Sequence, residues 1–288
     1  MNPVDKLMAR LPELQAKARE RAAKVASEGA GQPGKTDLVT QLPIWAEPLR
    51  CLPNEILRSA LFSAKNRNQP REYLKKQDIA VLFDGRIQYS GESLRQDDEN
   101  VWLQLIHLAK EQPLGSLVEF TPYAFCKAIG WSICKGSYER LRDSLERMQA
   151  TSLSIYSTRL QEGVNLSMIP MFAWQDEEKK TLTKYRVQVA PQILELFGAE
   201  HYTRIEWEQR LALPVGLATW LHGYYASHRK PYPVKIETIK KGAGLKTEKQ
   251  TKLRQIIDTA LQELIKVGFL SEARIEEDLV YVKRTKRN

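Results

Sequence analysis

Two segments of the sequence, roughly a hundred residues apart, share an order of residue types that could hold a polyanion. Residues 123–145 and 236–257 each show a short helical pattern, a break made of a glycine and an apolar residue, and a second helical pattern with a leucine between two cations. These are Arg140, Leu141 and Arg142 in the first segment and Lys252, Leu253 and Arg254 in the second. Because the flanking positions point to opposite sides of the buried stripe, we expect the leucine to anchor each helix and the cations to stay in solvent. A recognition helix of a helix-turn-helix presents charge to a phosphate-lined groove in this way.

The residues at the start of each second helix are expected to read base edges, because their side chains are polar or cationic. They are Ser137, Tyr138, Arg140 and Arg142 in the first segment and Thr247, Gln250, Thr251 and Lys252 in the second. Phosphate contacts are expected mainly from the more basic second segment and the end of the chain. Their predicted residues are Lys246, Lys249, Lys252, Arg254, Lys283 and Arg284. Two such heads span about two turns of duplex, so the site need not be a palindrome.

The positive charge is concentrated rather than spread along the chain. The 288 residues carry a net charge of +9, yet residues 227–254 alone hold nine lysines or arginines against two glutamates. The tail adds Lys283, Arg284, Lys286 and Arg287, which leaves the rest of the chain slightly acidic. A concentrated field steers a polyanion, whereas a solvated basic face is the alternative explanation.

Composition places the chain among globular proteins with room for two modest domains. Hydrophobic residues make up 42% of it, and no apolar run approaches the roughly 20 residues that span a bilayer. The N-terminus lacks the apolar core of a signal peptide, so a cytoplasmic location is expected. Cys51, Cys126 and Cys134 have no metal-site spacing and stand in apolar surroundings, which predicts reduced core thiols and no metal or cofactor.

The elements around these segments predict an α+β fold, with two tandem winged-helix domains after a flexible N-terminal arm. Residues 1–45 form the basic arm, 46–207 the first domain and 208–288 the second, which is expected to provide most DNA binding. Apolar periodicity predicts helices at 53–61 and 101–109, and then strands at 153–157, 166–174 and 185–189. In the second domain a helix opens at Pro214, the second helix-turn-helix follows, and residues 269–275 and 279–283 form a hairpin after Gly268.

Three blocks of sequence resemble the TrfA-type plasmid replication initiators from about Gln41 onward. They are Pro53–Phe62, Tyr89–Leu94 and Asp97–Trp102. The resemblance implies two tandem winged-helix domains that bind directly repeated sites, called iterons, in double-stranded origin DNA. It further implies opening of an AT-rich duplex, with single-stranded AT-rich DNA as a further partner, and recruitment of the host replicative helicase and host initiator. It also implies a monomer-dimer equilibrium, with dimerisation through the first domain and origin binding by monomers.

The same family suggests a role for the segment at the end of the arm, which is similar to a sliding-clamp-binding peptide. Its residues are Gln41, Leu42, Ile44 and Trp45. Such a peptide lies extended on a preformed pocket and is anchored by a buried aliphatic-aromatic pair. Trp45 stands where phenylalanine is usual, and Pro43 occupies the variable position. The alternative is that Ile44 and Trp45 pack onto the first domain.

Other functions remain as alternatives to the initiator. A winged-helix transcriptional repressor would bind one operator and support no origin activity. Gly29–Thr36 matches the P-loop pattern, but it follows a charged segment instead of a buried strand, and such a strand must hold the phosphate loop. The consecutive acids 97–99 cannot converge on a metal from one helix, and they complement a helix dipole instead. We therefore expect a binding protein and not an enzyme.

Overall fold

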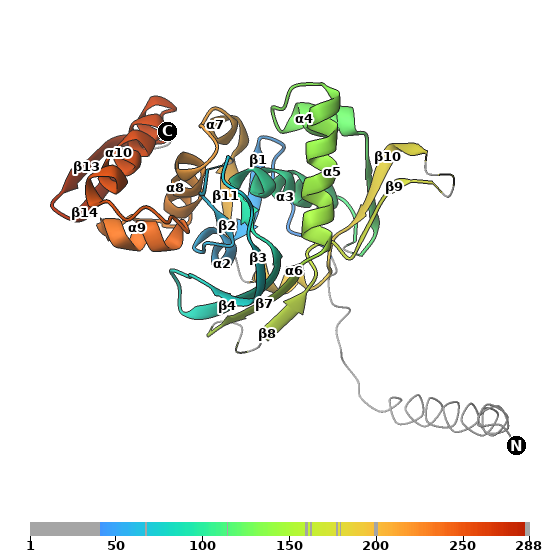
Figure 1. Cartoon of the computed structure of the whole chain (residues 1–288), viewed down its shortest axis with the longest axis horizontal. Helices are drawn as coiled ribbons and strands as arrows, with labels where there is room; N and C mark the ends of the chain where they lie inside the picture. Colours follow the sequence, from blue (N-terminus) through green and yellow to red (C-terminus); the bar gives the residue numbers. More distant parts are fainter. Residues whose placement is uncertain are drawn as a thin grey trace, which may run out of the picture. The chain divides into compact units, whose positions relative to one another are not determined.

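The computed structural model describes residues 41–285 except residues 67, 114, 159, 160, 162, 177, 179, 199 and 200. The arm up to residue 40, with its P-loop match at Gly29–Thr36, lies outside the described residues, as do Lys286 and Arg287. In the described part helices and strands are mixed, which confirms the α+β class (Figure 1). Among these residues no helix combines the length and the apolar character needed to cross a membrane.

A strand pair closes the first part of the fold on itself. The elements of this first part that concern the pairing are β1 (Leu49–Pro53), α2 (Asn54–Leu57), β2 (Phe62–Ser63), β5 (Leu94–Arg95) and β11 (Tyr202–Glu206). β1 and β11 run antiparallel with Leu49 opposite Glu206, and β2 pairs in parallel with β5. The prediction of a helix over 53–61 is therefore wrong in length. Only α2 is helical, because β1 and β2 hold residues on both sides of it.

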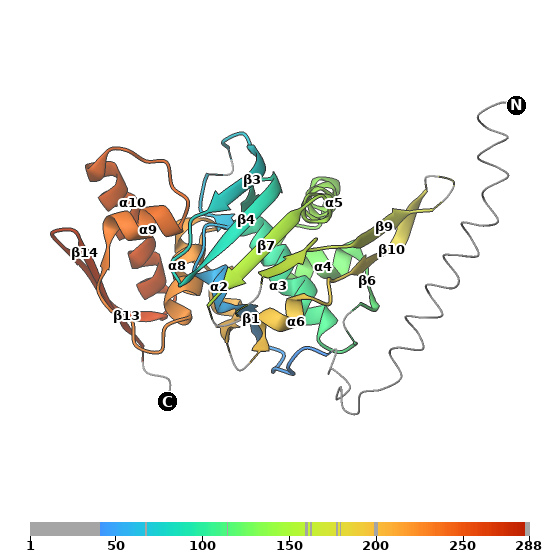
Figure 2. The same ribbon diagram turned by 90° about the horizontal axis from the view of Figure 1, so that it is seen from below.

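A four-stranded antiparallel sheet packs on this first part (Figure 2). Its strands are β3 (Tyr73–Ile79), β4 (Gly85–Glu92), β7 (Ser152–Ser157) and β8 (Gly163–Leu166). Every second residue of β7 and β8 is buried, as the alternation of Leu153 and Ile155 predicts. β3 has no buried residue and lies at an edge of the sheet, which explains why hydrophobic patterning did not detect it.

The first helix-turn-helix lies beside a second, three-stranded sheet of order β6-β10-β9. These elements are α3 (Gln96–Ala109), β6 (Leu117–Phe120), α4 (Pro122–Ala128), α5 (Lys135–Gln149), β9 (Met171–Gln175), β10 (Thr181–Gln188) and α6 (Ile193–Leu196). α3 confirms the predicted helix at 101–109 and is buried along nearly all its length. The strand predicted over 166–174 is divided, since its ends belong to β8 and β9 in different sheets.

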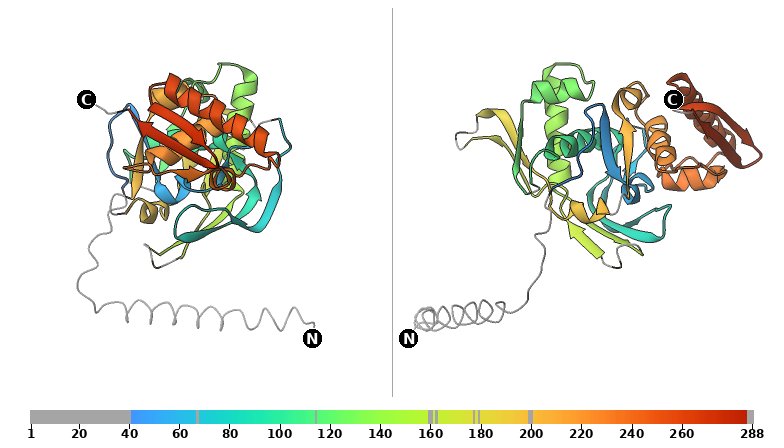
Figure 3. Two further views of the ribbon diagram at one scale, coloured as in Figure 1. Left: turned by 90° about the vertical axis from the view of Figure 1, so that its left-hand side faces the viewer. Right: turned by 180° about the vertical axis from the view of Figure 1, so that it is seen from behind.

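The second helix-turn-helix belongs to the C-terminal part. The elements are α7 (Trp207–Leu211), α8 (Leu217–Ala226), β12 (Val234–Lys235), α9 (Ile236–Gly242), α10 (Gln250–Lys266), β13 (Leu270–Glu276) and β14 (Leu279–Arg284). The predicted hairpin is confirmed as β13–β14, and β12 adds a third strand beside β14. α10 packs on the β13–β14 hairpin, as the left panel of Figure 3 shows. Leu253, Ile257, Leu261 and Leu264 are the fully buried residues that α10 contributes to this part.

Two apolar cores fill the described chain. The first includes buried residues from Leu42 to Trp207, and the second extends from Leu213 to Val280 with Ala64 as a single addition from the first part. Along the chain, the first core therefore ends at Trp207 and the second begins at Leu213, close to the predicted domain boundary at 207/208. Both cores lie within one compact unit of the chain.

The predicted flexible arm has to be shortened at its end, because residues 42 and 45 are buried in the first core. The indole N–H of Trp45 donates to Nδ1 of His107 at 3.0 Å, and its ring stacks on Phe197 with centroids 6.2 Å apart. Ile44, between the buried residues, is 78% exposed. This arrangement corresponds to the packing alternative for Trp45 but not for Ile44.

Trp45→Ala is expected to lower the free energy of unfolding by roughly 3–5 kcal/mol, because it leaves a cavity and removes one hydrogen-bond partner of His107. Chemical denaturation of the full chain measures this change. Ile44→Ala is the matched control and should alter stability little, since the Ile44 side chain is exposed. An unchanged midpoint for Trp45→Ala would contradict the packing of this residue.

Candidate nucleic-acid interface

The same turn joins the two helices in both helix-turn-helix segments. Gly130 after α4 and Gly244 after α9 have φ of 70° and 65°, the left-handed region that glycine adopts most readily. The closing hydrogen bonds run from Trp131 N to Cys126 O and from Leu245 N to Lys240 O, each 2.9 Å long. Both turns are Schellman motifs, in which a glycine ends the helix and the following apolar residue folds back on it. The glycine-apolar break found twice in the sequence is this turn.

The start of α10 presents the predicted side chains to solvent. Leu253 is fully buried, whereas Lys249, Gln250, Thr251 and Lys252 are exposed on the first turn of the helix. Arg254 is also exposed, but it already has partners. Its guanidinium donates to the carbonyls of Ile275 at 2.8 Å and Glu277 at 2.5 Å in the β13–β14 hairpin. Arg254 therefore holds the hairpin against α10, in addition to any phosphate contact.

The cations of α5 are more engaged than the sequence predicted. Leu141 is fully buried, as expected. Arg140 donates to Asp97 Oδ2 at 3.0 Å and lies 4.0 Å from the ring centroid of Trp131. Its side chain keeps 41% of its exposure. Arg142 lies 4.4 Å from the ring centroid of Trp174, in a cation–π contact with β9. Both cations thus stay accessible only in part.

The predictions for Ser137 as a base-reading residue and for Cys134 as a core thiol are wrong. Ser137 is buried, and its hydroxyl lies 3.2 Å from Ser132 Oγ and 3.4 Å from Cys134 Sγ, so it stabilises the start of α5 and is not placed to read bases. Cys51 and Cys126 are core thiols as predicted, but Cys134 is exposed. Residue 134 is the N-cap residue of α5 and lies before the helix begins, so the apolar residues around it in sequence do not show whether it is buried.

Tyr138 is half-buried against the first core and lines a groove of about 570 Å³. The groove runs along α5 toward β10 and also contains Arg142 and Lys135. Of the residues predicted on α5, Tyr138 and Arg142 therefore face this groove, while Arg140 faces a different and larger one.

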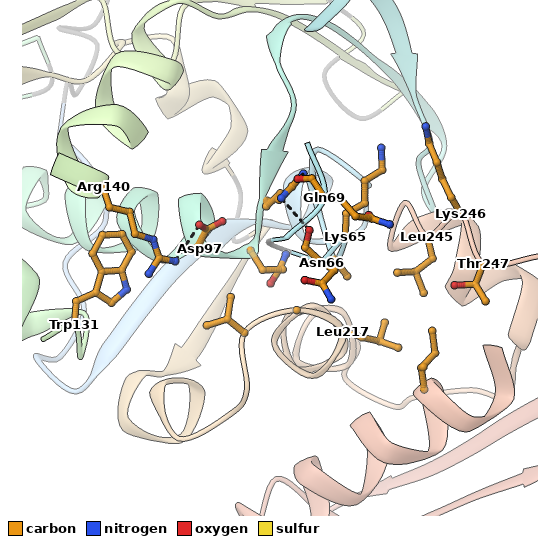
Figure 4. Close-up of a pocket in the computed structure, with 16 residues that line it drawn as sticks. Lys65, Asn66, Gln69, Asp97, Trp131, Arg140, Leu217, Leu245, Lys246 and Thr247 are labelled. Carbon is orange, nitrogen blue, oxygen red and sulfur yellow. Dashed lines mark hydrogen bonds and ion pairs between the residues drawn. The ribbon is translucent and has the colours of Figure 1, made fainter. Parts of the chain in front are cut away.

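The larger cleft, of about 790 Å³, lies between the two helix-turn-helix segments (Figure 4). Arg140 and Trp131 come from the first segment, and Lys246 and Thr247 come from the turn before α10. The remaining lining residues are Ala64, Lys65, Asn66, Gln69, Arg95, Gln96, Asp97, Val215, Gly216, Leu217, Leu245 and Ile256. Cations that are far apart in sequence therefore line one cleft. Lys246 forms an ion pair with Glu72, which also binds Lys65 at 3.2 Å.

Beneath this cleft, the acidic start of α3 is buried and surrounded by arginines. Asp98 accepts hydrogen bonds from Arg71 and Arg147, both at 2.7 Å, and from Ser144 at 2.8 Å. Burial opposes the charged form of Asp97, but the guanidiniums of Arg71 and Arg140 outweigh it and hold the pKa of this carboxyl below its ordinary value. The acids were predicted to complement a helix dipole, and the structure adds partners that are distant in sequence.

A third acid extends the same network toward the C-terminal part. Glu99 lies 3.4 Å from Arg210, a fully buried residue of α7. Arg210 also donates to Asn100 in α3 at 2.7 Å and to the carbonyl of Thr219 in α8 at 3.1 Å. Within the described part of the chain, no group of three or more His, Cys, Asp or Glu side chains could hold a metal ion.

The family model of the TrfA protein matches residues 34–284. The chain belongs to the TrfA family. It is 36% identical over 242 residues to the plasmid replication initiator protein TrfA of Escherichia coli. That alignment covers 83% of this chain and 63% of the relative, so the chain spans less than two thirds of the relative's length.

Two solved structures of RctB domains 2 and 3 have a similar fold to this member of the TrfA family. One gives a TM-score of 0.55 at 12% identity, covering 81% of this chain and 98% of that one. The other gives 0.51 at 11% identity, covering 78% and 93%. At this identity the likeness concerns the fold alone, and it extends over both parts of the described chain.

In this TrfA-family chain the remaining predicted residues lie on β14. Lys283 is exposed, whereas Arg284 lies 5.2 Å from the ring centroid of Phe269 and donates to the carbonyl of His228 at 3.4 Å. Sequence reasoning missed Lys65 and the polar residues beside it. Their segment has no periodicity, and only the cleft shows that they lie between the two helix-turn-helix units.

Cys134 offers a chemical test of this interface. Hydrogen bonds from the side chain and the backbone N–H of Ser137 lower the pKa of its thiol to about 7. Because the thiolate is the nucleophile, alkylation by iodoacetamide should accelerate as pH rises from 6 to 8, and bound duplex should slow it. Mass spectrometry of labelled peptides measures both effects.

Cys51 and Cys126 serve as internal controls for that experiment. Burial raises the pKa of their thiols to about 12 and about 11, so neither should react in the folded chain. Equal labelling of Cys134 with and without bound DNA would place the start of α5 away from the nucleic acid.

Proposed function

We propose that this chain is a plasmid replication initiator that binds directly repeated sites, or iterons, in double-stranded origin DNA. The observation that carries the proposal is that two helix-turn-helix units of a TrfA-family chain direct cations into one cleft. The proposal extends to opening of an AT-rich duplex and recruitment of host replication proteins, which the family resemblance implies. The chain acts by binding and not as an enzyme.

We further propose that the two units are tandem winged-helix domains. In the second, α8, α9 and α10 are followed by the β13–β14 hairpin, which is the order of helices and wing in that fold. In the first, α3, α4 and α5 precede strands that include the β9–β10 hairpin. The bonds from Arg254 to the β13–β14 hairpin support a wing that is fixed to its recognition helix.

The two units contribute unequally in this proposal. The exposed first turn of α10 reads bases through Gln250, Thr251 and Lys252, and Lys249 and Lys283 contact phosphates. Arg140 has one N–H group committed to Asp97 and keeps 41% of its exposure, so it offers a phosphate fewer free donors than the open cations of α10 do. α10 therefore supplies most of the affinity, while α5 adds contacts that form on binding. Dimerisation through the first domain is proposed from the family resemblance.

A mobility-shift titration across a salt series tests the electrostatic part. With about six phosphates neutralised, log Kobs should fall against log salt with a slope of roughly −5. Lys249→Ala should reduce that slope by about 1 and weaken binding to all sequences alike. Lys266→Ala, at the far end of α10 and similarly exposed, is the matched control and should change neither quantity.

The DNA beside the gene is to be scanned for direct repeats, which supply the duplex for this titration, and a replication assay of the linked origin accompanies it. A flat salt dependence would refute the DNA-binding proposal, and equal affinity for unrelated duplex would refute recognition of specific repeats. Specific binding to a single operator without origin replication would instead favour the transcriptional repressor.

The sliding clamp is proposed as a partner through the segment that contains Gln41, Leu42, Ile44 and Trp45. Since Leu42 and Trp45 are buried, the clamp must either use the exposed Gln41 and Ile44 or pull the segment out of the core. Ile44→Ala should therefore weaken binding of the purified host clamp without changing stability or DNA affinity. Surface plasmon resonance measures the clamp affinity, and wild-type affinity would remove this segment from the interface.

A further inference from the structure

A polar loop between β2 and β3 stands between the two helix-turn-helix units. Lys65, Asn66 and Gln69 from this loop line the cleft that also holds Arg140 and Lys246 (Figure 4). Asn66 and Gln69 are exposed, as is Asn68 beside them. The loop thus places amide side chains on the surface between α5 and the turn before α10.

A buried cation holds the described residues of this loop from below. Arg95, which is 3% exposed, donates to the carbonyls of Asn66 at 2.9 Å, Gln69 at 2.7 Å and Pro70 at 3.0 Å. Within the loop, the backbone N–H of Asn68 donates to Asn66 Oδ1 at 2.9 Å. A loop shaped in advance loses little conformational entropy on binding a ligand.

The charges beside the loop suit a phosphate. Lys65 from the first part of the chain and Lys246 from the second converge on the carboxylate of Glu72. An anionic group is therefore already held at the point where the two parts meet. A DNA phosphate that enters the cleft would take the place of this carboxylate on the same two lysines.

We propose that this loop enters the minor groove of the bound duplex, midway between the two recognition helices, as a third reading element. If α5 and α10 enter successive major grooves on one face of the duplex, the surface between them faces the intervening minor groove. Asparagine and glutamine are residues with which proteins contact that groove, where the N2 amino group of guanine distinguishes G·C from A·T. Asn66, Asn68 and Gln69 make this distinction, and Lys65 contacts a flanking phosphate.

This inference rests on the proposed function, and its test separates the two. The parent chain first selects its preferred duplex from a random library, which also supplies the probe. The double variant Asn66→Ala, Gln69→Ala is then compared with the parent on this duplex. We expect affinity to fall about tenfold and the preference at the central base pairs to be lost, with preferences at the outer positions retained.

Modified bases give the sharper readout. Inosine in place of a central guanine removes only the minor-groove amino group, and diaminopurine in place of a central adenine adds one. Either change should alter the affinity of the parent chain and leave that of the double variant unchanged. The double variant Gln112→Ala, Asn165→Ala is the matched control and should behave as the parent. Gln112 follows the far end of α3, about 20 Å from the helix start that lines the cleft, and Asn165 is exposed on β8.

If the Asn66→Ala, Gln69→Ala variant keeps the affinity of the parent and its response to the modified bases, the loop does not read the minor groove. Failure of the proposed function has a different signature, because the parent itself would then select no common sequence. Equal thermal midpoints of parent and variants establish that folding is intact.

Discussion

Three consecutive carboxylates are buried at the start of α3, and their need for positive partners determines how the helices around them are placed. A buried charge is tolerated only when opposite charges and hydrogen-bond donors surround it. Asp98 obtains them from Arg71 and from Arg147 of α5. Glu99 obtains Arg210 of α7, which continues to α8. One turn of helix thereby ties α5 to the start of the second core, and these pairs hold the walls of the cleft between the two helix-turn-helix units.

The two units share a turn but differ in how their cations are stored. In α10 the first turn is open to water, and only Arg254 is tied to its own hairpin. In α5, Arg140 rests between Asp97 and the ring of Trp131. A guanidinium held by a carboxylate keeps its direction without a ligand, and its remaining N–H groups stay available to a phosphate. In the unbound protein, Arg140 of α5 is therefore held by its partners, whereas the side chains on the first turn of α10 are open to solvent.

Local patterns were sufficient where a feature depends on neighbours in sequence. Gly130 and Gly244 end their helices, Leu141 and Leu253 anchor α5 and α10, and the C-terminal hairpin follows Gly268, all as the sequence indicates. Features that depend on distant partners were not predictable. Trp45 is buried because His107 and Phe197 receive it, and β3 exists because β4 pairs with it. The hydrophobic periodicity of the segments around Trp45 and in β3 does not indicate these distant partners.

The pairing of β1 with β11 brings the entrance and the exit of the first part of the chain together. The polypeptide passes directly from β11 into α7 and then into the second core. The C-terminal part is therefore attached to the first part at this seam, directly after the strand that completes it. The same seam makes β11 indispensable to its upstream neighbour, because a fragment that stops short of Tyr202 leaves every hydrogen-bonding group of β1 that faces it without a strand.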